Sequence, residues 1–147
     1  MAAIRKAHVV WTGDLLKGSG KVDATSSGAF NQLPVTWASR TEKSDGKTSP
    51  EELVAAAHAS CFCMALSAGL GKAGKPPTKL EVTATVTFEQ AGAGWKVKSS
   101  ELDLKGWVPG MDQAAFQQAA EGAKEGCPIS QALKGNVALS VDASLES

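Results

Sequence analysis

One helix constrains the fold of this 147-residue chain more than any other segment. From Leu53 to about Leu70 almost every residue is small or apolar. Its start is marked, because Ser49 is a typical N-cap, Pro50 suits the first helical position, and Ser49 with Glu52 fits a capping box. Since such a helix has no polar face, we expect it in the middle of a domain or between two subunits.

Strands and shorter helices flank this helix. Segments rich in β-formers predict three early strands, at Ala7 to Trp11, Lys21 to Thr25 and Val35 to Ala38. Alternating apolar residues predict three later strands, at 80–88, 95–107 and 137–145. Helices are predicted over 111–124 and 128–133, and a polar surface loop over 41–49. The fold class is therefore α+β, with antiparallel strands wrapped around a long central helix.

Length and composition bound the function classes. The length fits a single domain over residues 1–147, and 43% hydrophobic residues suffice for a core. Fifteen basic and fifteen acidic residues cancel, so no net charge favours nucleic acid or an anionic membrane. We see no signal-peptide pattern and no apolar run of membrane-spanning length, so we expect a cytoplasmic protein. The odd number of cysteines, three, argues against a secreted disulfide framework.

Two cysteines lie in contrasting local settings. Cys61 is inside the apolar helix, where a lone cysteine is more often a core filler than a reactive group. Cys127 precedes Pro128 at the start of a helix, where free N–H groups and the helix dipole lower the pKa of a thiol. The alternative role for Cys127 is that of a weak N-cap. Local patterns therefore favour Cys127 as the more reactive thiol. If folding brings the two together, they form a dithiol that can cycle through a disulfide.

Other candidate side chains depend on the fold. Cys63 points about 200° around the helix from Cys61 and is interpreted as packing. His58 shares a face with Cys61 and could deprotonate it, but such a histidine is more often a hydrogen-bonded core residue. Arg40, which ends the third predicted strand, and Glu51 matter only if the polar loop folds over Cys61. The arginine would then stabilise a thiolate and the carboxylate would hold the guanidinium.

Three segments, NQLPVTWASR, SPEELVAAAHASCFCMALS and GCPISQALKGNVALSVDASL, resemble the OsmC/Ohr family of thiol-dependent peroxidases. The resemblance covers nearly the whole chain and is closer to the OsmC branch. It implies an OsmC-like fold and an intertwined homodimer in which both subunits build each active site. The apolar helix fits such a buried interface.

The resemblance also implies roles for the residues that match. Cys61 takes the position of the peroxidatic cysteine and Cys127 that of the resolving one, which reverses the local ranking. Arg40 and Glu51 match the pair that activates the peroxidatic thiolate. The implied function is the reduction of organic hydroperoxides, and less specifically of hydrogen peroxide, through a Cys61 sulfenic acid and a Cys61–Cys127 disulfide, in defence against oxidative or osmotic stress.

The implied partners are small molecules and a second copy of the chain. No metal or flavin cofactor is expected, and an external dithiol reduces the disulfide, with lipoyl groups serving in the Ohr branch. An apolar lining around Cys61, including Phe62 and Met64, would favour organic hydroperoxides.

Two rival functions stay open. A zinc-binding protein could use four ligands of suitable softness, namely Cys61, Cys63, Cys127 and His58. The opposed directions of Cys61 and Cys63 on the helix count against it. A non-catalytic small-molecule binding module could keep the same scaffold, although the presence of both Cys61 and Cys127 argues for activity.

Overall fold

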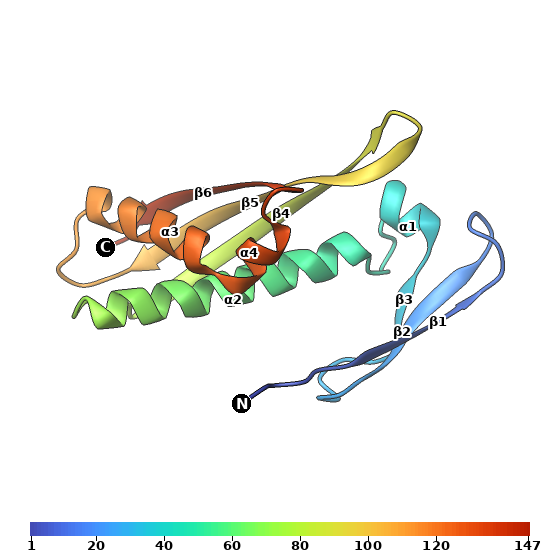
Figure 1. Ribbon diagram of the computed structural model, residues 1–147, viewed down its shortest axis with the longest axis horizontal. Coiled ribbons are helices and arrows are strands. Elements are labelled where there is room, and N and C mark those ends of the chain that lie inside the picture. The colour runs from blue at the N-terminus through green and yellow to red at the C-terminus, as the bar shows by residue number, and fades with distance from the viewer. The chain divides into compact units, whose positions relative to one another are not determined.

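The structure, a computed structural model, describes all residues from 1 to 147 (Figure 1). The chain divides into two compact units, residues 1–53 and 54–147, each of which is described by itself. The strands are β1 (Ala7–Thr12), β2 (Ser19–Thr25), β3 (Leu33–Val35), β4 (Lys79–Ala91), β5 (Gly94–Trp107) and β6 (Ala138–Leu145). The helices are α1 (Trp37–Thr41), α2 (Pro50–Lys72), α3 (Gln113–Gly126) and α4 (Pro128–Leu133). That residues 1–147 form one domain stays a prediction.

The N-terminal unit contains a three-stranded antiparallel sheet in the order β1-β2-β3. The predicted third strand, Val35 to Ala38, is wrong beyond its first residue, because a helix begins there. The Thr36 hydroxyl accepts the N–H of Ser39, and the Ser39 hydroxyl accepts the N–H of Thr36, each at 3.0 Å. This reciprocal capping box starts α1, so Arg40 lies in the last turn of a helix and not at the end of a strand.

The start of α2 confirms the predicted N-cap. The Ser49 hydroxyl accepts the N–H of Glu52 at 3.1 Å, and the Ser49 carbonyl accepts the N–H of Leu53. The return half of the predicted capping box is replaced, because the Glu52 carboxylate accepts a hydrogen bond from the Thr48 hydroxyl at 2.8 Å. The loop before α2 is thus tied to the first turn of the helix.

The C-terminal unit contains a second sheet, in the order β4-β5-β6. Strands β4 and β5 pair antiparallel, as predicted, but β5 and β6 pair parallel, with Leu102 opposite Val141. The prediction of antiparallel strands throughout is therefore wrong for β6. Between β5 and β6 the chain passes through α3 and α4, and such a crossover returns the second strand in the direction of the first.

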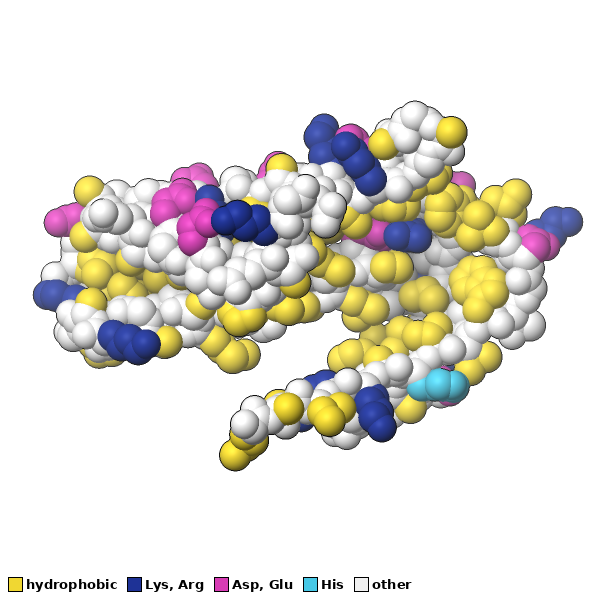
Figure 2. Space-filling view, viewed as in Figure 1, with side chains coloured by type: hydrophobic (Ala, Val, Ile, Leu, Met, Phe, Trp, Pro, Cys, Tyr) yellow, Lys and Arg dark blue, Asp and Glu magenta, His cyan; other side chains and the backbone are white.

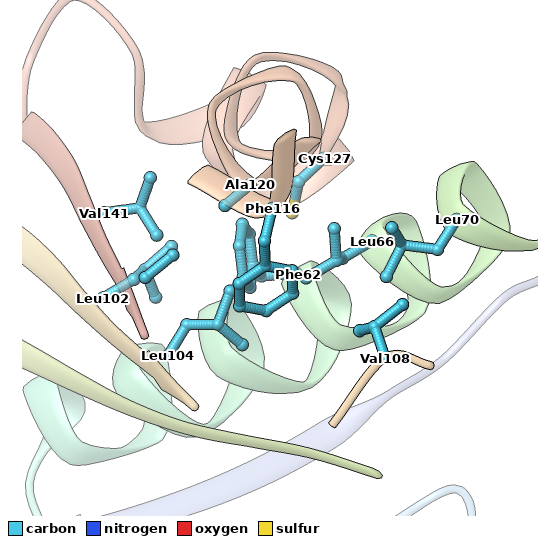
Figure 3. Close-up of a cluster of buried hydrophobic side chains, with 11 residues drawn as sticks. Phe62, Leu66, Leu70, Leu102, Leu104, Val108, Phe116, Ala120, Cys127 and Val141 are labelled. Carbon is cyan, nitrogen blue, oxygen red and sulfur yellow. The ribbon is translucent and has the colours of Figure 1, made fainter. Parts of the chain in front are cut away.

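Helices α2 and α3 pack against the same face of this sheet, which makes α2 the predicted central helix (Figure 3). The core cluster draws on both helices, β5 and β6: Phe62, Leu66, Leu70, Leu102, Leu104, Val108, Phe116, Ala120, Cys127, Val141 and Ala143. On β5 the buried leucines alternate with exposed residues such as Glu101 and Asp103, so only one face of β5 is covered. Gly106 is required here, because a Cβ atom would lie 2.1 Å from Cζ of Phe116.

The length of α2 corrects one expectation. By length and composition this helix is apolar enough to cross a membrane, so the statement that no apolar run reaches that length is wrong. Three of its residues, Phe62, Leu66 and Leu70, are at most 1% exposed in the core of the C-terminal unit. A core helix satisfies the same length and composition criteria, and this packing is the role that the structure gives α2.

Candidate active site

The C-terminal unit brings Cys61 and Cys127 together. Cys61 lies midway along α2. Cys127 is both the C-cap of α3 and the N-cap of α4. Both are free thiols. Cys61 packs against the core cluster that contains Cys127, and each thiol shifts the pKa of the other. Cys127 is fully buried, whereas Cys61 is partly exposed and so is the one that a small molecule can reach.

The two thiols have opposite pKa shifts. Burial raises the pKa of Cys61, its interaction with Cys127 raises it further, and the N–H of Ile129 offsets only part of this. Burial alone would also raise the pKa of Cys127. The Ser130 N–H, the Cys61 thiol, the Ser130 hydroxyl and the Ile129 N–H outweigh that effect, so the pKa of Cys127 is lowered. Within this unit the local prediction holds: Cys127 is the more acidic thiol.

The first turn of α4 explains this asymmetry. The N–H groups there have no helical acceptor, and Pro128 at the first position has no N–H to offer. The Cys127 side chain makes no capping hydrogen bond. The N–H groups of Ser130 and Ile129 nevertheless lower the pKa of its thiol. The sequence signal for this environment, a cysteine before a proline at a helix start, was therefore informative.

Arg40 and Glu51 form a tight pair in the N-terminal unit. Nη2 of Arg40 lies 2.7 Å from Oε1 of Glu51, and Nε donates to both carboxylate oxygens at 3.1 Å. The Glu51 side chain is 9% exposed and the Arg40 side chain 30%. The guanidinium carbon also lies 5.9 Å from the centre of the Trp37 ring. The pair holds the arginine in a fixed orientation, as the sequence reasoning required.

His58 is a hydrogen-bonded core residue. Its Nδ1 lies 2.7 Å from the Ser100 hydroxyl on β5, and its Nε2 lies 2.8 Å from the Ser130 hydroxyl on α4. Burial lowers the pKa of His58, so the ring is neutral at physiological pH. Sequence reasoning missed Ser100 and Ser130. Only Ser130 could have been linked to the dithiol from the sequence, because it stands three residues after Cys127 on the same short predicted helix.

Cys63 and Met64 do not join the dithiol. Cys63 is partly buried, and burial raises the pKa of its thiol. Met64 is 69% exposed, so it provides no enclosed lining in this subunit, whereas Phe62 lies inside the core.

The zinc hypothesis is not supported, because no group of three or more His, Cys, Asp or Glu side chains could hold a metal ion. Both ring nitrogens of His58 are also engaged by serines.

Comparison with known proteins decides the family. Residues 42–142 match the family described as OsmC-like protein. The chain is 42% identical to Peroxiredoxin OsmC of Escherichia coli (strain K12) over 139 residues, which is 95% of this chain and 96% of that protein. The chain belongs to the OsmC family. The predicted resemblance and the predicted OsmC-like α+β fold are thereby confirmed.

The Ohr branch of the OsmC/Ohr proteins is also similar. The chain is 30% identical to organic hydroperoxide resistance protein OhrA of Bacillus subtilis (strain 168) over 105 residues, covering 70% of this chain and 72% of that protein. Among solved structures, OhrB of Bacillus subtilis matches with a TM-score of 0.73 at 23% identity, covering 95% of this chain and 98% of that one. The identity to OsmC is higher than to OhrA, in agreement with the predicted branch.

Proposed function

We propose that this protein is a cysteine-based peroxidase that reduces organic hydroperoxides, with Cys61 as the peroxidatic and Cys127 as the resolving thiol. The observation that carries the proposal is that two free thiols, one partly exposed and one buried, pack into the same core cluster. The enzyme class is supported by the OsmC relative named a peroxiredoxin, which matches 95% of the chain. The substrate class is supported by relatives named organic hydroperoxide resistance proteins.

The first two steps of the proposed cycle take place at these two sulfurs. The Cys61 thiolate attacks the terminal oxygen of the hydroperoxide, the S–O bond forms, the O–O bond breaks, and the departing alkoxide takes up a proton to become the alcohol. Cys61 is then a sulfenic acid. The Cys127 thiolate attacks the Cys61 sulfur, the S–S bond forms, and the hydroxide that leaves takes up a proton to become water. The disulfide protects Cys61 from further oxidation.

An external dithiol, for which we propose a lipoyl group, completes the cycle. One of its thiolates attacks the disulfide, and its second sulfur displaces the mixed disulfide, so the reductant leaves oxidised and both cysteines return as thiols. No metal or flavin is required by this chemistry. We place it in the cytoplasm, in defence against oxidative or osmotic stress, because an odd number of cysteines argues against a secreted disulfide framework.

The Cys61 thiol needs a neighbouring cation to ionise at neutral pH. Its pKa is raised, so at neutral pH little of it is thiolate without a neighbouring cation. Glu51 stands in the first turn of α2, about three turns before Cys61 on the same helix. We therefore propose that the Arg40–Glu51 pair of a second copy in a homodimer serves Cys61. The exposed apolar side chains of β1, Val9 and Val10, and of Met64 on α2 supply surface for such an interface.

Combining one slowed and one inactive variant tests whether the two subunits share each site. We expect Arg40→Met to slow the oxidation of Cys61 by roughly ten- to a hundredfold, because a charged hydrogen bond to the thiolate is lost. Co-expression of Arg40→Met with Cys61→Ser gives heterodimers in which one site has both an intact thiol and an intact arginine. Random pairing then restores roughly a quarter of the activity of the unmodified dimer. Assays of the single variants and of the purified mixture measure this, and a mixture with no more activity than its parts would contradict the shared site.

An apolar groove in the C-terminal unit supports organic substrates. It holds about 520 Å³ between α2 and α3, and hydrophobic side chains are visible along it at the left of the molecule (Figure 2). Gly126 and Pro128, which flank Cys127, line it together with Ala65, one helical turn after Cys61. The groove thus offers a site for the organic group of a hydroperoxide next to the dithiol.

Filling the groove tests this substrate site. Gly122 lines the groove on α3, and a Cβ atom there meets nothing within 4 Å, so a larger side chain is tolerated. We expect Gly122→Leu to raise KM for cumene hydroperoxide by roughly tenfold, since the leucine occupies the apolar space that would bind the ring. KM for hydrogen peroxide stays unchanged. Gly122→Ala is the matched control, and equal effects of Gly122→Leu on both peroxides would place the organic group elsewhere.

A further inference from the structure

A fully buried histidine connects two serines beside the dithiol. His58 is 0% exposed, as is Ser100, and Ser130 is 2% exposed. The ring bridges the two hydroxyls at 2.7 Å and 2.8 Å. Burying three polar side chains in an apolar core is costly unless they are fully hydrogen-bonded. None of the three takes part in the peroxide chemistry proposed above, so their presence calls for another role.

The last member of this chain lies on the same short helix as Cys127, three residues after it. Cys127 is the N-cap of α4 and Ser130 is the third residue of that helix, and side chains at these two positions are neighbours. The Ser130 hydroxyl is one of the groups that stabilise the Cys127 thiolate. The hydroxyl makes no hydrogen bond to a carbonyl of its own helix, so its proton is available to the sulfur.

The neutral ring gives the hydrogen bonds a direction. When the Ser100 hydroxyl donates to Nδ1 of His58, the single ring proton is on Nε2 and is donated to the Ser130 oxygen. A hydroxyl that accepts there has its own proton free to donate to Cys127. When Cys127 is a thiol, the same four groups can reverse all their donors and acceptors. By reversing these donors and acceptors, the chain can match either protonation state of the sulfur.

We propose that His58 and Ser130 are positioning residues for the resolving step: the Ser100–His58–Ser130 chain turns the Ser130 hydroxyl toward Sγ of Cys127 and holds that sulfur as the attacking thiolate. The inference rests on the proposed function, because it takes Cys127 as the resolving thiol. In the step itself, the Cys127–Cys61 bond forms as the S–O bond of the sulfenic acid breaks. The Ser130 proton stays on its own oxygen throughout, and the hydroxide displaced from Cys61 takes up a proton to become water.

No other charged group near Ser130 supplies this stabilisation. Cys61 faces Cys127 from α2, and the titratable groups beyond Ser130 line a cavity of about 190 Å³: Lys124, Glu125 and Lys134. All three are engaged in ion pairs, Lys124 with Glu121 and Lys134 with Glu125, at 2.8 and 3.3 Å. The pKa of Cys127 is therefore expected to respond to the serine and not to these paired charges.

A direct titration of Cys127 tests the chain without any peroxide. In Cys61→Ser/Cys63→Ser protein Cys127 is the single thiol, so its thiolate absorbance in the ultraviolet reports its pKa. We expect Ser130→Ala and His58→Leu in this background to raise that pKa and Ser130→Thr to restore it. Ser99→Ala is the matched control, because Ser99 is a buried serine next to Ser100 that does not contact His58. If His58→Leu does not fold, Ser100→Ala tests the same link. An unchanged pKa in Ser130→Ala overturns the proposal.

The pH dependence of disulfide formation gives a second readout. After Cys61 is oxidised by one equivalent of hydroperoxide, rapid quenching and mass measurement follow formation of the Cys61–Cys127 disulfide. At pH 7 we expect Ser130→Ala to form it roughly three- to tenfold more slowly, because less Cys127 is thiolate. Above the raised pKa the two rates converge, since a more basic thiolate is intrinsically at least as nucleophilic. Equal slowing at every pH would mean a merely structural role and would overturn the proposal.

The two experiments separate this inference from the proposed function. If Cys61 of the unmodified protein is not oxidised by hydroperoxide, the proposed function fails, while the titration of Cys127 still decides whether Ser130 and His58 act on its thiol. If Cys61 is oxidised at the normal rate in Ser130→Ala and only disulfide formation slows at neutral pH, both stand.

Discussion

Replacing Cys61 by serine is expected to abolish hydroperoxide consumption, with a loss of at least about a thousandfold in kcat/KM. The reacting group is a thiolate, and a serine hydroxyl is not ionised at any pH at which the protein is folded. Cys61 is the partly exposed member of the dithiol, so no other sulfur in the pair can take its place at the peroxide. The assay is consumption of cumene hydroperoxide with a lipoyl dithiol as reductant.

The matched control is Cys63→Ser. Cys63 lies on the same helix but turns away from Cys61 and does not interact with Cys127. We expect this variant to retain full activity. If Cys61→Ser kept full turnover, or if Cys63→Ser lost it, the assignment of the peroxidatic thiol would be wrong.

Replacing Cys127 by serine is expected to separate the two halves of the cycle. Cys61 should still be oxidised in the first turnover, because the exposed thiol remains. Without the resolving sulfur the sulfenic acid persists, and excess hydroperoxide converts it irreversibly to the sulfinic acid. Steady-state turnover then decays within a few cycles, and intact-protein mass spectra show the added oxygen atoms on Cys61.

The same variant offers an internal check on the mechanism. A dithiol reductant added before the peroxide can rescue the sulfenic acid but not the sulfinic acid, so the order of addition changes the yield of active enzyme. Sustained turnover by Cys127→Ser in excess peroxide, with Cys61 still a thiol afterwards, would show that Cys127 does not resolve the intermediate.

The contrast between the two thiols defines what the second subunit of the proposed homodimer would have to supply. The single subunit makes Cys127 acidic through the N–H groups of α4 and the Ser130 hydroxyl, but it leaves the pKa of Cys61 raised. A fixed cation is therefore needed at Cys61. Arg40 suits this role, because its hydrogen bond to Glu51 fixes the orientation of the guanidinium.

The elements that the sequence predicted well are those specified by local chemistry. Ser49 and Pro50 mark the start of α2 because capping and a proline at the first position act within one turn. Helix α4 was predicted with its observed bounds for the same reason. The short helix α1 was missed because its capping box uses Ser39, not the usual Glu or Gln, at the third position.

Long-range relations could not be predicted from local patterns. Alternating residues show that β6 is a half-buried strand, but not that it lies parallel to β5, which depends on the crossover through α3 and α4. His58 was expected to be hydrogen-bonded in the core. Its partners Ser100 and Ser130, separated from it by 42 and 72 residues, could be identified only once the chain had folded.

The central claim is that hydroperoxide converts the two free thiols into one disulfide within the chain. The most direct measurement treats the reduced protein with one equivalent of cumene hydroperoxide and then maps its cysteines by peptide mass spectrometry. We expect a peptide pair joined through Cys61 and Cys127, loss of two thiols for each peroxide consumed, and a free Cys63. A Cys61 that remains a thiol, or one that pairs with Cys63, would contradict it.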